Sequence, residues 1–245
     1  MCIKIKSSKV AEFLNDCTHS LLYKNNSAET TEIRFIMSVI NMLSSSQGLK
    51  GNEANISLAK GILACDNKVA VKELVENLSN KNKNIQSDCI KTLYEIGYLK
   101  PELIANYHGD FIKLLTSKNN RLIWGGMIAL STITDLKHAE IFDSLNIILD
   151  TVNKGSVITI DAGVEILARL NKHAKYVNVT EPLLMEQLWK CPIKQLPMYI
   201  DKSIASIRKD GKEIYLTLIE RRKKECDNDS QAKRLDKSLK QIKNI

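Results

Sequence analysis

The chain has 245 residues, of which 44% are apolar and 5% aromatic, with only four prolines and ten glycines. This composition suffices to bury a core, and it favours helices joined by short polar turns over a β-sandwich or barrel. The net charge is +8, but residues 1–9 contribute +3 and residues 208–245 contribute +5, so residues 10–207 are formally neutral, which argues against strong non-specific DNA affinity.

The sequence gives no indication of export or membrane insertion. The N-terminal residues include lysines but no apolar run, so no secretory signal is predicted. No stretch approaches the ~18 apolar residues that a membrane span needs. The cysteines are widely spaced and form no C-x-x-C pair, which indicates reduced thiols. We therefore expect a cytoplasmic protein that does not enter a membrane.

Residues 1–66 are expected to form an N-terminal cap of divergent repeats. Apolar residues at three- and four-residue spacing predict helices over 8–24, 28–45 and 52–65. These helices do not fit the repeat that follows. End units of a repeat protein differ in sequence because they must present a polar outer face.

Residues 67–209 contain four consecutive units that are related by a step of about 37 residues. The columns that begin at Leu74, Leu78, Leu93 and Ile96 hold only large apolar side chains in all four units. First helices are predicted over 68–78, 101–116, 139–152 and 181–191, and second helices over 85–99, 121–133, 157–170 and 195–209. Pro197 lies where the fourth second helix should start, so that helix is expected to begin late or to kink.

Residues 210–245 form a charged C-terminal segment. Two amphipathic helices are predicted, over 213–225 and 230–243. These helices could cap the stack of repeats or extend from it.

Small residues recur midway along the second helices. The 37-residue step relates Gly126 to Cys89 and Gly163, and Gly125 precedes Gly126 directly. Glycine costs about 1 kcal/mol of helix propensity, which close packing of two helices can offset. We interpret the glycine pair as a crossing point, since no phosphate-binding glycine motif surrounds it.

Helix pairs with small residues midway along the second helix and aliphatic residues just after, as in "GGMIALSTI" (125–133), resemble HEAT or armadillo repeats. The resemblance covers residues 67–209. It implies an all-α fold, a right-handed α-solenoid of HEAT- or armadillo-like helix pairs, and no particular activity. The arginine typical of the early second helix is present only as Arg121.

No catalytic residue, metal site or small-molecule cofactor is predicted. The four histidines lack the i, i+4 partner of a zinc-protease helix, and no nucleophile-elbow or EF-hand pattern occurs. A solenoid can assemble a catalytic site from separate repeats, so this argument lowers the expectation of an enzyme without removing it.

The binding surface of a solenoid is usually its concave face, which the second helices line. If Leu93 faces the core, one stripe of the second helices carries the side chains Lys91, Glu95, Trp124, Asp161, Glu165 and Arg169. A tryptophan among charges is suited to anchor a protein partner. The alternative is that Trp124 packs between repeats and that the charges are simply solvated.

This stripe is also similar to that of bacterial alkylpurine-DNA glycosylases built from HEAT-like repeats. That resemblance implies a site of Trp124 and Asp161, with Arg169 contacting a DNA phosphate. The chain departs from the pattern at Ser87 and Met198, where supporting aromatic residues would be needed.

The turns between first and second helices are basic and contain no acidic residue. Their cationic side chains are Lys81, Lys83, Lys118, Arg121, Lys154, Lys190 and Lys194. Turns at equivalent positions project from one edge of a solenoid, so these charges are predicted to form a ridge, which a neutral total can conceal.

Two functions follow from these patterns. The leading hypothesis is a non-enzymatic scaffold that binds a protein partner on the concave face, with no cofactor. The alternative is a nucleic-acid-binding or DNA-repair-like protein that uses the basic ridge.

Overall fold

The computed structural model describes residues 38–245, and all regular secondary structure in that part of the chain is helical. The predicted helix over 8–24 and most of that over 28–45 lie outside the described residues. The prediction of an all-α fold is confirmed. The chain divides into two compact units, one ending at Leu136 and the other spanning Lys137–Ile245.

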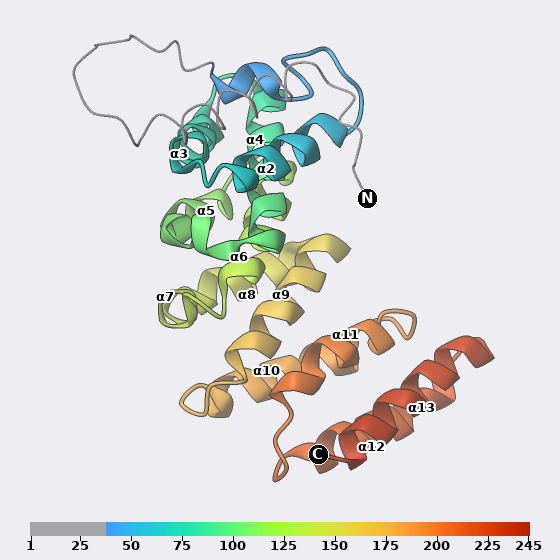
Figure 1. The fold of residues 1–245 in the computed structure, drawn as a ribbon. Helices are drawn as coiled ribbons and strands as arrows, with labels where there is room; N and C mark the ends of the chain where they lie inside the picture. Colours follow the sequence, from blue (N-terminus) through green and yellow to red (C-terminus); the bar gives the residue numbers. More distant parts are fainter. Residues whose placement is uncertain (1–37) are drawn as a thin grey trace. The chain divides into compact units, whose positions relative to one another are not determined.

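The first unit consists of helices that follow one another in sequence order (Figure 1). Its α-helices are α2 (Glu53–Ala64), α3 (Lys68–Glu76), α4 (Lys83–Leu99), α5 (His108–Leu114) and α6 (Asn120–Ile133). Short 3₁₀ helices occupy Val39–Met42, Asn77–Ser79, Pro101–Leu103 and Ala105–Tyr107. The predicted first helix over 101–116 is thus divided into two 3₁₀ turns and α5.

Asparagine side chains cap the starts of α4 and α6. Oδ1 of Asn82 accepts a hydrogen bond from the backbone N–H of Asn84 (2.9 Å), and Oδ1 of Asn119 accepts one from Arg121 (3.1 Å). An asparagine at this position satisfies one of the backbone donors that a helix leaves free at its start. The asparagine-rich turns therefore set the beginnings of α4 and α6 at Lys83 and Asn120.

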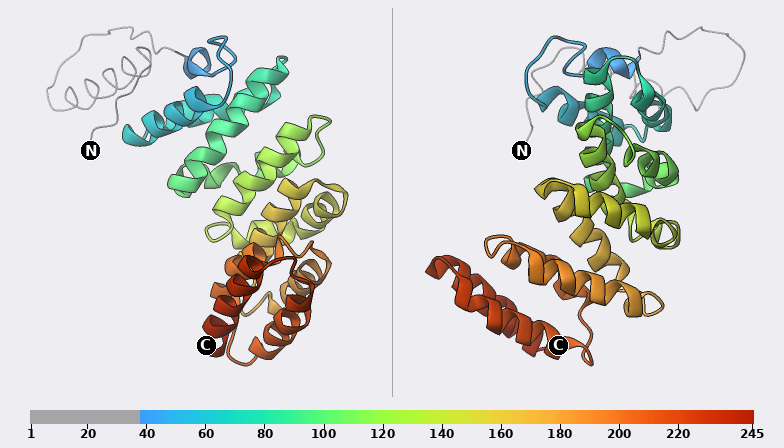
Figure 2. Two further views of the ribbon diagram at one scale, coloured as in Figure 1. Left: turned by 90° about the vertical axis from the view of Figure 1, so that its right-hand side faces the viewer. Right: turned by 180° about the vertical axis from the view of Figure 1, so that it is seen from behind.

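Helices α4 and α6 run parallel and in register, as the left view of Figure 2 shows. Near their N-termini, Asn119 donates to Gln86 (3.2 Å). In the middle a Cβ on Gly125 would lie 2.4 Å from Cγ1 of Ile90, and near the C-termini a Cβ on Gly97 would lie 2.3 Å from Oγ1 of Thr132. Glycine lets the two backbones approach at both places.

The second unit contains α7 (His138–Asp143), α8 (Leu145–Lys154), α9 (Val157–Leu170), α10 (Val177–Lys190), α11 (Leu196–Ser203), α12 (Lys212–Arg222) and α13 (Asp229–Lys243). Short 3₁₀ helices extend α11 over Ile204–Ser206 and α12 over Lys223–Glu225. Helix α11 begins at Leu196, one residue after the predicted start, with Pro197 in its first turn.

The apolar columns form the cores of the two units. Leu93, Leu130 and Leu167 are fully buried, as the repeat predicts. The column that begins at Leu78 does not stay buried in α10. There the 37-residue step leads from Val152 to Trp189. Trp189 is 42% exposed, whereas the preceding Leu188 is fully buried. The buried stripe of α10 is therefore displaced by one residue from the predicted register.

The charged C-terminal helices pack on the rest of the second unit. The guanidinium of Arg234 on α13 donates to Asp201 of α11 (2.5 Å). Arg222 of α12 is 6% exposed and donates from Nη1 to the backbone carbonyl oxygens of Leu188, Trp189 and Cys191 at 2.9, 3.0 and 2.8 Å. These carbonyls belong to the C-terminal end of α10, where a helix leaves its acceptors free. These contacts join α12 to α10 and α13 to α11 within the second unit.

Candidate functional site

The outward side of α4 and α6 carries aromatic residues. Since Ile90 faces Gly125, the residue after Ile90 and the residue before Gly125 lie on the same side of the helix pair. These residues are Lys91 and Trp124. We call this surface the α4–α6 face; its residues are Lys91, Tyr94, Glu95, Tyr98, Trp124 and Ile128.

The first helices do not cover the α4–α6 face. A Cβ on Gly126, the residue after Gly125, would lie 3.1 Å from the carbonyl oxygen of Phe111 in α5, so α5 packs on the opposite side of α6. Tyr98 is accordingly 57% exposed, and Trp124 is half-buried. The face is thus available to a partner within this unit.

The charges of the α4–α6 face neutralise each other. Nζ of Lys91 lies 2.5 Å from Oε1 of Glu95, with side chains that are 17% and 20% exposed, and 4.6 Å from the centre of the Tyr94 ring. Burial lowers the pKa of Lys91, but its hydrogen bonds to Glu95 and Tyr94 outweigh that effect and leave the pKa raised. The lysine therefore stays charged and paired.

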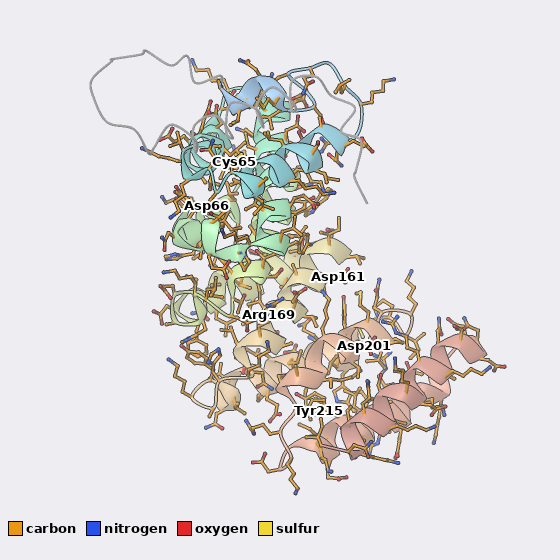
Figure 3. The ribbon with its side chains drawn as sticks, in the orientation of Figure 1. Cys65, Asp66, Asp161, Arg169, Asp201 and Tyr215 are labelled. Carbon is orange, nitrogen blue, oxygen red and sulfur yellow. The ribbon has the colours of Figure 1, made fainter. Side chains whose placement is uncertain are left out.

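The other predicted partner-binding residues lie on α9 in the second unit, where Asp161 and Arg169 mark two levels of the helix (Figure 3). Tyr199 of α11 donates to Asp161 (2.6 Å), and Lys202 of α11 donates to Glu165 (2.6 Å). Arg169 donates to the other oxygen of Glu165 (2.9 Å). We call these five residues the α9–α11 network.

Protonation in the α9–α11 network follows from these contacts. Burial raises the pKa of Glu165, but the hydrogen bonds and charges of Lys202 and Arg169 exceed that effect, so the pKa is lowered. Burial, together with the hydrogen bond to Asp161, raises the pKa of Tyr199, which therefore remains a donor. The network holds two carboxylates and two cations and is neutral as a whole.

The structure thus divides the predicted stripe between the two units. It pairs Lys91 with Glu95 in the first unit and joins Asp161, Glu165 and Arg169 in the second, while Trp124 belongs to α6. Sequence reasoning missed Tyr199, because the 37-residue step from Asp161 leads to Met198. Pro197, which lies in the first turn of α11, was the signal in the sequence for a change of register there.

The predicted basic ridge has a different character in each unit. Lys81, Lys83, Lys118 and Arg121 are exposed, and none of them forms an ion pair with another residue of the described chain. We call these four residues the basic edge; they flank the starts of α4 and α6. In the second unit, Lys154 pairs with Asp150 (2.7 Å) and Lys190 pairs with Glu186, which leaves Lys194 as the exposed cation of those turns without such a pair among residues 38–245.

No helix within residues 38–245 combines the length and apolar character that crossing a bilayer requires. The sequence matches no protein-family model, and no curated protein is significantly similar to it.

The solved structures with a similar fold include engineered proteins and designed armadillo repeat proteins. One engineered protein superimposes with a TM-score of 0.60 at 16% identity, covering 97% of this chain and 98% of its own. A designed armadillo repeat protein gives a TM-score of 0.58 at 12% identity, covering 95% and 99%. Another, in complex with the peptide (KR)4, gives 0.58 at 14% identity, covering 96% and 100%. The chain therefore has an all-α, armadillo-like repeat fold.

Proposed function

We propose that the protein is a non-enzymatic scaffold that binds a segment of a protein partner on the α4–α6 face. The observation that carries the proposal is the exposed aromatic surface on two parallel second helices. Tyr98 and Trp124 supply large side chains with few rotatable bonds, which are enriched among the residues that dominate binding energy. The related fold in complex with a peptide supports the same use of the fold.

The geometry favours binding over catalysis. A general acid or base needs a titratable group that is free to exchange a proton with a substrate. Glu95 and Glu165 are instead held by cations in the folded protein. The glycosylase resemblance requires Asp161 and Arg169 to act on DNA, yet Asp161 accepts a hydrogen bond from Tyr199 and Arg169 is paired with Glu165.

In the second unit, we infer that the α9–α11 network serves as a polar contact surface for the same partner or another. Tyr199 and Lys202 of α11 hold Asp161 and Glu165, and Glu165 in turn holds Arg169, so little side-chain entropy is lost when a partner binds them. Because the network is neutral as a whole, we expect it to fix the orientation of a bound partner more than to add to the electrostatic attraction between the two.

A peptide selection tests the proposal. Peptides are selected from a random display library against the whole chain, and their affinities are measured for variants. Trp124→Ala and Tyr98→Ala are each expected to weaken the selected peptides about tenfold or more. Tyr98→Ala is the safer variant because Tyr98 is more than half exposed, and its ring contacts that of Tyr94 edge-on at the same face, with centres 6.0 Å apart.

Trp189 provides the matched control. It is also a large, partly exposed aromatic residue, but it lies on α10 in the other unit. Trp189→Ala should leave the affinity unchanged. Wild-type affinity in both folded Trp124→Ala and Tyr98→Ala variants would exclude the α4–α6 face as the binding surface.

A further inference from the structure

The basic edge is not neutralised, although the chain elsewhere pairs many of its cations. In the first unit Lys72, Lys91, Lys100 and Lys113 each lie within 4 Å of a carboxylate, at 3.7, 2.5, 2.6 and 3.1 Å. The four cations of the basic edge have no such partner within residues 38–245. The residues from 79 to 87 and from 116 to 124 contain no aspartate or glutamate. Because no carboxylate neutralises these four cations, the basic edge carries a positive electrostatic potential.

The helix starts strengthen this field. Lys83 is the first residue of α4, Arg121 is the second residue of α6, and neither helix has an acidic residue in its first turn. The exposed N–H groups at a helix start carry a partial positive charge, so cations there are unfavourable and anions favourable. The hydrogen bond between Asn119 and Gln86 joins the two turns, which keeps the four cations together.

The basic edge is continuous with the α4–α6 face. On α4, Lys83, Ser87 and Lys91 follow at four-residue spacing and share one stripe. On α6, Arg121 precedes Trp124 by three residues, which places them on the same side of the helix. A partner segment that contacts Trp124 therefore lies within one turn of α6 from Arg121, at the basic edge.

We propose that the segment bound by the α4–α6 face is acidic, with aspartates or glutamates that contact the basic edge next to an apolar or aromatic residue that contacts Trp124. This inference rests on the proposed function and specifies its partner. The only acidic side chain of the face, Glu95, is already paired with Lys91, so the face offers little to a cationic peptide. The expected charge of the ligand is opposite to that of the (KR)4 peptide bound by the designed armadillo repeat protein.

A protein segment fits better than nucleic acid. Affinity for DNA comes largely from cations that neutralise phosphates, and the edge supplies four cations beside a neutral face. In the second unit, the equivalent turns are largely neutralised by Asp150 and Glu186. The field is local and matches a short acidic segment.

Fluorescence anisotropy with three labelled peptides tests the inference on the whole chain. The first peptide joins an Asp-Glu octamer to a Trp-Leu-Leu anchor, the second joins (KR)4 to the same anchor, and the third joins a Gly-Ser octamer to it. The acidic peptide is expected to bind at least tenfold more tightly than the basic one. Its advantage over the Gly-Ser peptide should shrink as salt is raised from about 50 mM to about 500 mM, because salt screens exposed charges.

Charge reversal locates the effect. The variant with Lys81→Glu, Lys83→Glu, Lys118→Glu and Arg121→Glu should lose the preference for the acidic peptide and keep the affinity for the Gly-Ser peptide. Glutamates at these helix starts suit the helix dipole, so folding should be preserved. The matched control reverses four exposed cations outside the edge and has the same net charge: Lys60→Glu, Lys68→Glu, Lys209→Glu and Lys224→Glu.

The outcomes separate this inference from the proposed function. An equal loss in both quadruple variants, or tighter binding of the (KR)4 peptide, overturns an acidic ligand at the basic edge. Displacement of the acidic peptide by an unlabelled oligonucleotide that itself binds more tightly assigns the edge to nucleic acid and also overturns it. If Trp124→Ala weakens the Gly-Ser peptide while charge reversal changes nothing, the proposed function stands and this inference fails.

Discussion

Gly125 and Gly126 are adjacent in α6 but contact different helices. A Cβ on Gly125 would meet Ile90 of α4 at 2.4 Å, and a Cβ on Gly126 would meet α5 at 3.1 Å. Two neighbouring residues of a helix point about 100° apart, so one glycine pair can serve two helix contacts. The interpretation of the pair as a crossing point is confirmed, and each glycine has its own neighbour.

Gly125→Ala is therefore expected to destabilise the protein, although alanine is normally the better helix former. The added methyl group would overlap two branches of the buried Ile90 side chain, which must move. Overpacking of this kind costs about 1–3 kcal/mol and exceeds the ~1 kcal/mol gain in propensity. The measurement is the free energy of unfolding from denaturant titration followed by circular dichroism.

Gly109 provides the opposite case within the same unit. It is the second residue of α5, and a Cβ there would meet nothing within 4 Å. Gly109→Ala should stabilise the protein by about 0.5–1 kcal/mol. If Gly125→Ala also stabilised the protein, backbone propensity rather than helix contact would govern these positions.

At the scale of the helix, the sequence predicted most elements but not their register throughout. Helices α4, α6 and α9 match their predicted ranges to within two residues, because periodic apolar residues mark all three and asparagine caps mark the starts of α4 and α6. In α10 the buried stripe is displaced, since Leu188 rather than Trp189 is buried. Whether the buried stripe shifts by one residue depends on how neighbouring helices pack. The repeat period in the sequence holds no information on that packing. The pairing of Tyr199 with Asp161 was missed for the same reason.

Arg222 joins α12 to α10, and its loss should release the C-terminal helices. Arg222→Met keeps the apolar stem but removes the donor to three backbone carbonyls at the end of α10. In the variant these three carbonyl oxygens stay buried without the charged donor that they contact in the native protein. We expect this loss to lower the free energy of unfolding by about 3 kcal/mol. Denaturant titration, with tryptophan emission from Trp189 as a local probe, measures the loss.

Glu225→Gln is the control for the contribution of the ion pair. Glu225 lies 2.7 Å from the Arg222 guanidinium, but its side chain is 53% exposed. Exposed pairs of this kind contribute at most about 1 kcal/mol. A loss in Glu225→Gln as large as that in Arg222→Met would mean that the ion pair, and not the carbonyl contacts, secures α12.

For the molecule as a whole, the armadillo-like fold predicts that stability is local. In a repeat protein each helix pair contacts only its neighbours, so stability is approximately a sum of repeat and interface terms. The two compact units of this chain, divided after Leu136, provide a test of that expectation. Gly125 belongs to the first unit and Arg222 to the second.

Hydrogen exchange measured by mass spectrometry on the whole chain compares the two variants. Gly125→Ala should lower amide protection in α4, α5 and α6 and leave α11, α12 and α13 unchanged, while Arg222→Met should do the reverse. The reason is that local opening requires only the contacts of the helices involved. A uniform loss of protection along residues 38–245 in either variant would show one cooperative unit. In that case a partner bound at the α4–α6 face would protect amides as far away as α13, whereas local stability confines its protection to the first unit.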